Sequence, residues 1–454
     1  MPEEVKQLED YSKDVDALLS EIKDTADLTR SQIGESVERI TVLEKKARNA
    51  NDLKSTSRLV VKAVNMAIAQ KNLDKLKEIV HGFAKKHGQM RTVIVEAVRA
   101  ASGICDDQVE DVYTLQGQQR EDLIQSLRTI TEGKMFLEAE RARLTYILSH
   151  VLLSRNETRK ARDVLAELSV ETFGSLDRRQ KTDYLLQQAF LNAQIGDWVQ
   201  MKIVTNKINV KFFKEEDTQE QKLRYYEYLI RYAVHNDEYL NACRYYREVY
   251  DTDVIKSDES RSKVVLENIV YFVLLAPFNH EQHDLLHRIF ADQTFNTPKL
   301  QYQYNLLKCF TTPELMRWAG LEALYGQILK STDVFSNRST DGKGQARFDE
   351  FHKRVLEHNV RVVYKYYTNI TLKRLQSFLE VDERQVEEIL SSLVQNGTIY
   401  AKIDRPAKVI TFTKPKKTED VLNDFTNNIT KLLSLVETVN YQIEKEKAVQ
   451  EAFK

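Results

Sequence analysis

Residues 144–168 read LTYILSHVLLSRNETRKARDVLAEL, and this stretch indicates the fold of most of the chain. Apolar side chains recur at steps of three and four residues on both sides of Asn156-Glu157, which is the pattern of two amphipathic helices joined by a tight turn. A single helix pair of this kind cannot bury its apolar face alone, so neighbouring pairs must stack. We therefore expect this stretch to be one element of a helical repeat.

Turn-forming pairs recur along the chain at an interval of about forty residues, which is the period of a stacked helix–turn–helix array. A further turn is expected at Lys71-Asn72. Such arrays present long surfaces to other proteins, so a scaffold is a more natural expectation than an enzyme. The sequence predicts a mainly α protein with a helical-repeat, TPR-like solenoid over residues 51–335. The repeating pairs are Gln116-Gly117, Asn156-Glu157, Gly196-Asp197, Asn236-Asp237 and Ala276-Pro277.

The bulk composition narrows the class of protein. The 454 residues include 67 basic and 68 acidic side chains, for a formal net charge of −1, so no bulk attraction to nucleic acid or anionic membrane is expected. Cys105, Cys243 and Cys309 are odd in number and widely spaced, which argues against a disulfide framework or a zinc knuckle. The N-terminus lacks an apolar signal core, and the longest apolar run, Ile269–Ala276, is shorter than the roughly twenty residues of a membrane span. We expect a soluble protein of the cytoplasm and nucleus.

The pattern changes after a polar stretch at residues 336–344 (SNRSTDGKG), which is the best candidate for a flexible loop. Residues 345–415 then follow the order of a winged helix, with three helices before two short β-rich runs at 398–403 and 408–413. The third helix has a clear core stripe. This stripe consists of Val386, Ile389, Leu390 and Leu393.

The end of the chain, residues 418–454, is expected to form one helix with a heptad seam. Burying its seven apolar side chains would contribute on the order of ten kcal/mol before the cost of association, so we expect the seam to need a partner. The N-terminal helical segment, residues 1–50, carries a narrow seam of the same kind that includes Val15 and Leu18. The C-terminal seam consists of Leu422, Phe425, Ile429, Leu432, Val436, Val439 and Ile443.

A winged helix invites a DNA-binding interpretation, but its third helix argues against one. Duplex readers place basic and amide side chains there, whereas residues 382–388 carry four carboxylates and one guanidinium. The tyrosines crowded between Tyr225 and Tyr250 could stack RNA bases, although packing of large rings between repeat helices explains them more simply. We expect no nucleic acid partner.

The sequence offers few candidates for chemistry. His280, His283 and His287 fall on one side of an expected helix, so divalent metal binding is conceivable. The second histidine comes one residue too early for the His-Glu-x-x-His motif, and polar residues at the start of a repeat helix explain the group without metal. Gly342-Lys343-Gly344 lacks the spacing of a phosphate-binding loop, and no nucleophile elbow is present. We expect no catalytic residues, no cofactor and no bound metal.

Helical repeats followed by a winged helix and a terminal helix resemble the PCI-domain family, which is shared by the proteasome lid, the COP9 signalosome and translation initiation factor three. Several specific blocks are similar to the proteasome lid branch and span most of the chain. Phe425 stands where the family usually has tryptophan, and it keeps an aromatic residue in the seam. The blocks are residues 131–145 (TEGKMFLEAERARLT), 170–175 (VETFGS), 207–213 (KINVKFF), 274–289 (LLAPFNHEQHDLLHRI), 309–318 (CFTTPELMRW), 357–375 (EHNVRVVYKYYTNITLKRL) and 397–412 (GTIYAKIDRPAKVITF).

The resemblance implies a non-catalytic scaffold subunit of the proteasome regulatory particle lid, supporting lid assembly and ubiquitin-dependent protein degradation. In that family the winged helices associate side by side through their small sheets, and the C-terminal helices gather into one bundle. The resemblance also implies that the repeats reach toward the proteasome core particle and the lid deubiquitylating subunit. A PCI subunit of the COP9 signalosome or of a translation initiation factor complex is the alternative.

The implied assembly is a hetero-oligomer without nucleic acid or membrane. Its expected partners are the other PCI subunits of the lid, the deubiquitylating subunit and the core particle. Two surfaces are expected to make these contacts, the hairpin of the winged helix and the C-terminal seam. The predicted interface residues in the hairpin are Val409, Ile410 and Phe412.

Overall fold

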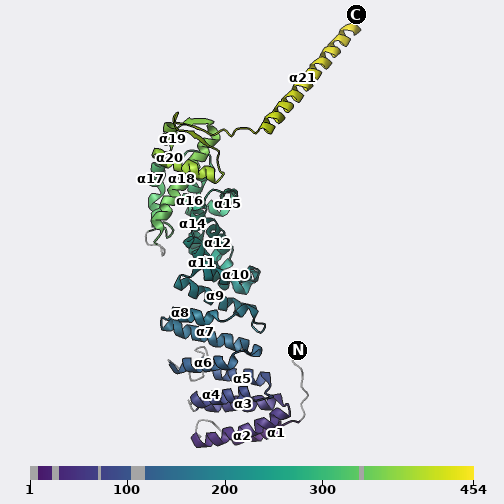
Figure 1. The fold of residues 1–454 in the computed structure, drawn as a ribbon, viewed down its shortest axis with the longest axis vertical. Helices are drawn as coiled ribbons and strands as arrows, with labels where there is room; N and C mark the ends of the chain where they lie inside the picture. The colour runs from purple at the N-terminus through teal and green to yellow at the C-terminus, as the bar shows by residue number, and fades with distance from the viewer. Residues whose placement is uncertain (1–8, 23–29, 70–72, 104–117, 337–341, 454) are drawn as a thin grey trace. The chain divides into compact units, whose positions relative to one another are not determined.

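The computed structural model describes residues 9–22, 30–69, 73–103, 118–336 and 342–453 (Figure 1). The chain divides into two compact units, one of residues 1–233 with 252–254 and the other of residues 234–251 with 255–454. Helices dominate both units, which confirms the predicted mainly α class. No helix in the described ranges combines the length and the apolar composition that crossing a membrane requires.

The first unit is a stack of helices, as the repeat pattern predicts (Figure 1). They are α1 (Ser12–Glu21), α2 (Arg30–Asn49), α3 (Leu53–Ala69), α4 (Leu73–Lys85), α5 (Arg91–Ser102), α6 (Gln118–Thr131), α7 (Glu138–Ser154), α8 (Thr158–Ala166), α9 (Arg178–Ile195) and α10 (Trp198–Asn206), while α11 (Gln219–His235) runs across the boundary between the units. Short 3-10 turns η2 (Met135–Leu137), η3 (Val170–Thr172), η4 (Val210–Lys214) and η5 (Glu216–Thr218) join some of them. Consecutive helices such as α7 and α8, or α8 and α9, pack against each other, so each pair buries its neighbour's apolar face.

The core of this unit is continuous along the stack. Leu144 of α7 and Leu165 of α8 are both fully buried. Val15 of α1 is fully buried in the same core and Leu18 packs at its margin, so the N-terminal helix is part of the first unit.

Three of the predicted turns contain a residue with a positive φ angle. Asn156 lies between α7 and α8 with φ 62°, and Gly196 ends α9 with φ 84°, both in the left-handed region that Gly and Asn tolerate best. The Asp197 side chain then accepts a hydrogen bond from the Gln200 N–H at 3.1 Å and caps α10. Asp237 has φ 59° in the predicted turn Asn236-Asp237, which follows α11. The turns predicted at Lys71-Asn72 and Gln116-Gly117 lie outside the described residues, as does Cys105.

The second unit continues with further helices and ends in a small sheet. The helices are α12 (Tyr239–Tyr250), α14 (Glu259–Leu275), α15 (His280–Ala291), α16 (Gln301–Thr311), α17 (Trp318–Ser331), α18 (Gly344–Tyr366), α19 (Leu372–Leu379), α20 (Glu383–Gln395) and α21 (Thr418–Ala452), with α13 (Asp253–Ser257) at the boundary and the 3-10 turns η6 (Gln293–Phe295) and η7 (Pro298–Leu300) between α15 and α16. The apolar run Ile269–Ala276 forms the buried end of α14, and the predicted turn at Ala276-Pro277 follows it.

The crowded tyrosines pack inside the helical array. Tyr225, Tyr226, Tyr228 and Tyr239 are each less than 10 % exposed, and the Tyr246 ring stacks on Phe272 with centroids 5.5 Å apart. Buried rings cannot stack on bases, so the packing interpretation is confirmed for these residues.

The winged helix is built from α18, α19, α20 and three strands in the order β1 (Asn369–Thr371), β3 (Val409–Thr411) and β2 (Lys402–Asp404), all antiparallel. Two strands were expected and β1 was missed. The predicted stripe of α20 lies in the core, with Val386, Leu390 and Leu393 no more than 2 % exposed. Asp382 occupies the N-cap position of α20, but its side chain makes no capping hydrogen bond.

Candidate protein-interaction surfaces

The helix α21 exposes its whole length, and every residue from Thr418 to Ala452 is exposed. The seven residues of the C-terminal seam keep between 40 % (Ile429) and 63 % (Phe425) of their surface accessible. A soluble monomer rarely leaves a contiguous apolar stripe of this length in water. The arrangement therefore provides a helix face that another protein can bury.

The seam widens near its centre. Leu433 and Leu435, 58 % and 63 % exposed, flank the seam residues Leu432 and Val436 on either side. The other flanking heptad positions carry mainly uncharged side chains such as Asn428 rather than the Glu and Lys that set pairing in two-stranded coiled coils. A broad apolar face with few flanking charges fits a bundle of several helices better than a single partner helix.

The hairpin residues predicted for an interface lie elsewhere than expected. Ile410 and Phe412 are 0 % and 3 % exposed and belong to the core of the winged helix, so their side chains are not on its surface. Val409 is half-buried in β3, which is the central strand of the sheet and pairs with β1 on one side and β2 on the other. A proline at position 410 would therefore disrupt the module's own sheet rather than a contact with a neighbour.

A groove lies beside β2, which is a terminal strand of the sheet. Its volume is about 780 Å³, and Val394 at the end of α20 is 37 % exposed in it. A free strand edge next to apolar side chains is the geometry that accepts an extended segment by strand addition. This β2 groove was missed from the sequence, where Val394, next to the core stripe, was the only signal. Its apolar lining is Leu390, Val394, Ala401, Ile403 and Pro406.

Two basic residues of the hairpin are paired with carboxylates of the same module. Arg405 forms an ion pair with Glu387 at 3.0 Å, and Lys408 forms one with Glu383 at 3.4 Å. The carboxylates of α20 thus compensate the cations that would otherwise meet phosphates. The first turns of α20, with four carboxylates and one guanidinium, do not offer a duplex a basic helix.

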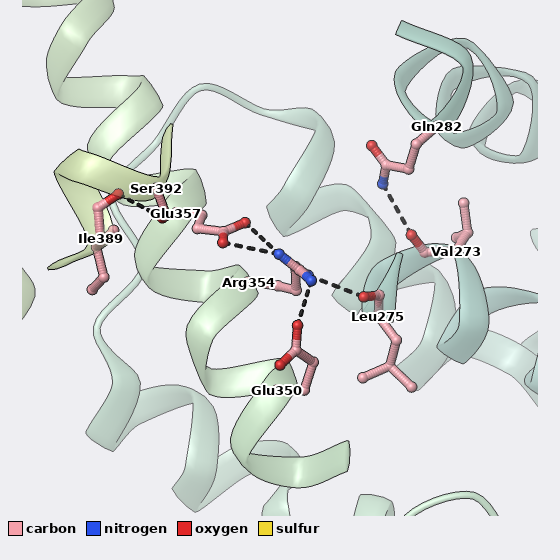
Figure 2. A network of polar contacts seen from close by, with 8 residues as sticks. All are labelled: Val273, Leu275, Gln282, Glu350, Arg354, Glu357, Ile389 and Ser392. Atoms are coloured by element: carbon pink, nitrogen blue, oxygen red, sulfur yellow. Dashed lines mark hydrogen bonds and ion pairs between the residues drawn. The ribbon is translucent and has the colours of Figure 1, made fainter. Parts of the chain in front are cut away.

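The helix α18 fastens the winged helix to the helices that precede it. Figure 2 shows its Arg354 donating to the carbonyl oxygen of Leu275, at the end of α14, at 3.0 Å. The same guanidinium bonds both carboxylate oxygens of Glu357, at 2.7 and 2.9 Å, and also contacts Glu350. Charge-assisted bonds in a mostly buried position hold Arg354 in one orientation, so α14 and α18 are fixed relative to each other.

Two neighbouring side chains on α18 add to this connection. The Asn359 side chain accepts from the Met316 N–H at 2.9 Å and donates to the Met316 carbonyl at 2.7 Å, and it is 1 % exposed. His358 Nε2 lies 3.3 Å from the Glu314 carbonyl oxygen. Burial and the nearby Arg361 lower the pKa of His358 to about 4, so the ring is neutral and Nε2–H is the donor at neutral pH.

The predicted histidine group is only partly brought together. His283 and His287 on α15 place their Nε2 atoms 3.1 Å apart, and partial burial together with His287 lowers the pKa of His283. No group of three or more His, Cys, Asp or Glu side chains suited to a metal ion occurs within the ranges that the structure describes.

Known protein families match three parts of this chain. A family model for the N-terminal region of PSMD12 and CSN4 matches residues 35–258, and the PCI domain matches residues 314–414. The C-terminal domain of 26S proteasome regulatory subunit RPN5 matches residues 419–451, which include the whole C-terminal seam.

Proteins from three organisms are similar to this chain over most of its length. The 26S proteasome regulatory subunit rpn501 of Schizosaccharomyces pombe is 39 % identical over 93 % of this chain and 94 % of its own length. The 26S proteasome regulatory subunit RPN5 of Saccharomyces cerevisiae is 36 % identical over 97 % of both chains. The 26S proteasome non-ATPase regulatory subunit 12 of Dictyostelium discoideum is 34 % identical over 93 % of this chain and 92 % of its own.

Proposed function

Since this chain belongs to the family of 26S proteasome regulatory subunits that includes RPN5 and non-ATPase regulatory subunit 12, we propose that it is a non-catalytic scaffold subunit of the regulatory particle lid. Its role is to hold other subunits together during lid assembly and, through the assembled particle, to support ubiquitin-dependent protein degradation.

The observation that carries this proposal is the exposed face of α21. Its seven seam residues would contribute on the order of ten kcal/mol if buried, which is enough to organise a helix bundle after association costs. The breadth of the face around Leu432 and Val436 favours several partner helices. Those partners are the C-terminal helices of the other PCI subunits.

The winged helix supplies a second contact. A neighbouring PCI subunit adds an extended segment along β2 and places an apolar side chain in the β2 groove, against Val394 and Ile403. The helical repeats contact the core particle and the deubiquitylating subunit, and the protein works in the cytoplasm and the nucleus. A COP9 signalosome subunit is the second candidate, because the matched N-terminal family also includes CSN4. The match to the RPN5 C-terminal domain favours the proteasome.

Affinity purification of the tagged full-length chain from its own cells, followed by quantitative mass spectrometry, tests the assignment. We expect other regulatory particle subunits at amounts close to that of the tagged chain, together with core particle subunits. Recovery of signalosome subunits in their place would reassign the function, and recovery of the chain alone would contradict a scaffold role.

A further inference from the structure

A group of aromatic and basic side chains covers the winged helix where α18 ends and β1 begins. All six residues from Tyr364 to Asn369 are exposed, and Tyr366 keeps 63 % of its surface accessible. Three tyrosines exposed in four positions are unusual for a surface with no partner, because tyrosine is enriched at protein interfaces. We call this group the tyrosine patch, and it consists of Tyr364, Lys365, Tyr366, Tyr367, Arg374 and Phe378.

The patch is ordered by contacts with the module beneath it. The Tyr364 ring meets buried Phe412 edge-on with centroids 5.7 Å apart. Tyr367 lies 6.2 Å from Phe378, and the Arg374 guanidinium lies 4.6 Å above the Phe378 ring. Rings held in this way lose little conformational entropy on binding, which favours their use as anchors for a partner.

The cations of the patch differ from those of the hairpin. Arg405 and Lys408 are paired with carboxylates of α20, whereas no carboxylate of the described residues lies within ion-pair distance of Lys365 or Arg374. Lys365 instead lies 6.0 Å above the Tyr366 ring. Two hairpin cations are therefore compensated within the module, whereas Lys365 and Arg374 present positive charge beside exposed aromatic rings.

We propose that the tyrosine patch is a docking surface for an acidic segment of a partner protein. Carboxylates of the segment pair with Lys365 and Arg374, and its aliphatic groups pack on the tyrosine rings. A second copy of this chain docked patch to patch would bring Lys365 and Arg374 against the same cations, so a symmetric self-contact is disfavoured. Nucleic acid is also disfavoured, because the chain carries a formal net charge of −1 and offers phosphates no bulk attraction.

This surface is separate from the C-terminal seam and the β2 groove, so the inference does not depend on the proposed lid function. The test replaces Tyr366 with the photo-cross-linking residue p-benzoylphenylalanine in the full-length chain in its own cells. The cross-linked peptide is identified by mass spectrometry after irradiation. The same residue at Gln385, exposed on the acidic helix α20, serves as the matched control.

We expect Tyr366 to cross-link to one protein segment in which Asp and Glu outnumber Lys and Arg, and Gln385 not to reach that segment. Lys365→Glu with Arg374→Glu should lower the yield roughly tenfold, because reversed charges repel the segment. Lys365→Arg with Arg374→Lys should keep the yield. Circular dichroism checks that the variants are folded.

Five outcomes would overturn the proposal. They are a cross-link to RNA or DNA, a cross-link to a second copy of this chain, a cross-linked segment without excess carboxylates, the absence of any cross-link at Tyr366, and a cross-link yield that the charge reversal leaves unchanged. Co-purification of the tagged chain with lid subunits is scored separately, so failure of one proposal is distinguishable from failure of the other.

Discussion

Two helices of this protein carry apolar stripes with similar spacing and opposite surroundings. In α20 the stripe is covered by α18, α19 and the sheet, and Leu390 is 1 % exposed. In α21 the stripe is covered by nothing within the described chain, and Leu432 is 57 % exposed. The apolar pattern alone thus says that a face must be buried, and only the structure says whether the same chain buries it.

The contrast separates two kinds of stabilisation. The winged helix draws its core from residues of this chain, so its stability belongs to the monomer. The C-terminal seam contributes little to the monomer, because transfer of apolar surface out of water is favourable only when a partner covers it. An assembly subunit needs both kinds, one to fold and one to join its neighbours.

Charge placed in the C-terminal seam should have the largest effect on the assembly of this chain with its partners. Ile429→Asp with Val436→Asp should leave the chain soluble and folded while lowering its incorporation into the larger complex by at least about a hundredfold, because each unpaired buried carboxylate costs several kcal/mol. Co-purification of the tagged double variant with its partners measures the effect.

The matched control for this prediction is Asn427→Asp with Ser434→Asp. These residues have the same spacing on the opposite face of α21, so they add the same charge without entering the seam. Equal incorporation of the two double variants would show that the seam is not an assembly element.

A pair of leucine truncations compares how much the stripe of α20 and the C-terminal seam each stabilise the isolated chain. Leu390→Ala should lower the free energy of unfolding of the second unit by about 2–5 kcal/mol through a core cavity. Leu432→Ala should change it by less than about 0.5 kcal/mol, because that side chain is already in water. Urea unfolding followed by Trp318 fluorescence, in a Trp198→Phe background, reports on the second unit because Trp318 packs on Phe348 of α18. Similar losses in both variants would mean that α21 is buried by its own chain.

Much of this contrast could be predicted from the sequence, because helix periodicity and turn chemistry are local. The turns at Asn156 and Gly196, the stripe of α20 and the seam of α21 follow from residue type and spacing. The PCI-domain resemblance is confirmed by the match over residues 314–414.

The rest depends on contacts between distant segments. The strand β1 is as short as β2 and β3, but it stands alone between α18 and α19, whereas β2 and β3 lie in two β-rich runs joined by a turn that marks a hairpin. Ile410 in β3 and Phe412 just after it lie on the same side because side chains alternate along an extended chain, but only the position of the three helices decides that this side is the inner one. The bonds from Arg354 and Asn359 to backbone groups of other segments leave no local signal.

Buried His358 on α18 also predicts that the stability of the folded chain depends on pH. Burial lowers the pKa of His358 from the usual 6.5 to about 4, so the unfolded chain binds a proton in this range that the folded chain does not. The stabilisation is complete above about pH 6.5 and is lost as the pH falls toward 4, by on the order of 3 kcal/mol. Urea unfolding followed by Trp318 fluorescence, at steps of about one unit from pH 7.0 to pH 5.0, measures how the free energy of unfolding changes with pH.

His358→Gln keeps an N–H donor near the Glu314 carbonyl and removes the titration. The stability of this variant should fall less steeply with decreasing pH than that of the unmodified chain. Identical slopes for the two proteins would contradict the lowered pKa of His358.

The smallest expected effect concerns the β2 groove. Val394→Ser should weaken incorporation into the complex roughly tenfold, because one apolar contact in the groove is lost. Val264→Ser on α14 is the control, since Val264 is also exposed but lies far along the chain from the groove. Quantitative co-purification that finds no difference between these two variants would remove the groove from the interface.

Hydrogen–deuterium exchange of α21 and α20, measured in the isolated chain and in the purified complex, tests the central claim most directly. An unsupported helix in water opens readily, so peptides covering residues 418–452 should exchange within seconds in the isolated chain. We expect these peptides to become protected by at least about a hundredfold in the complex, while peptides from α20 are protected equally in both states. Fast exchange of α21 in the complex, or equal protection of α21 in both states, would contradict the conclusion that other subunits bury its seam.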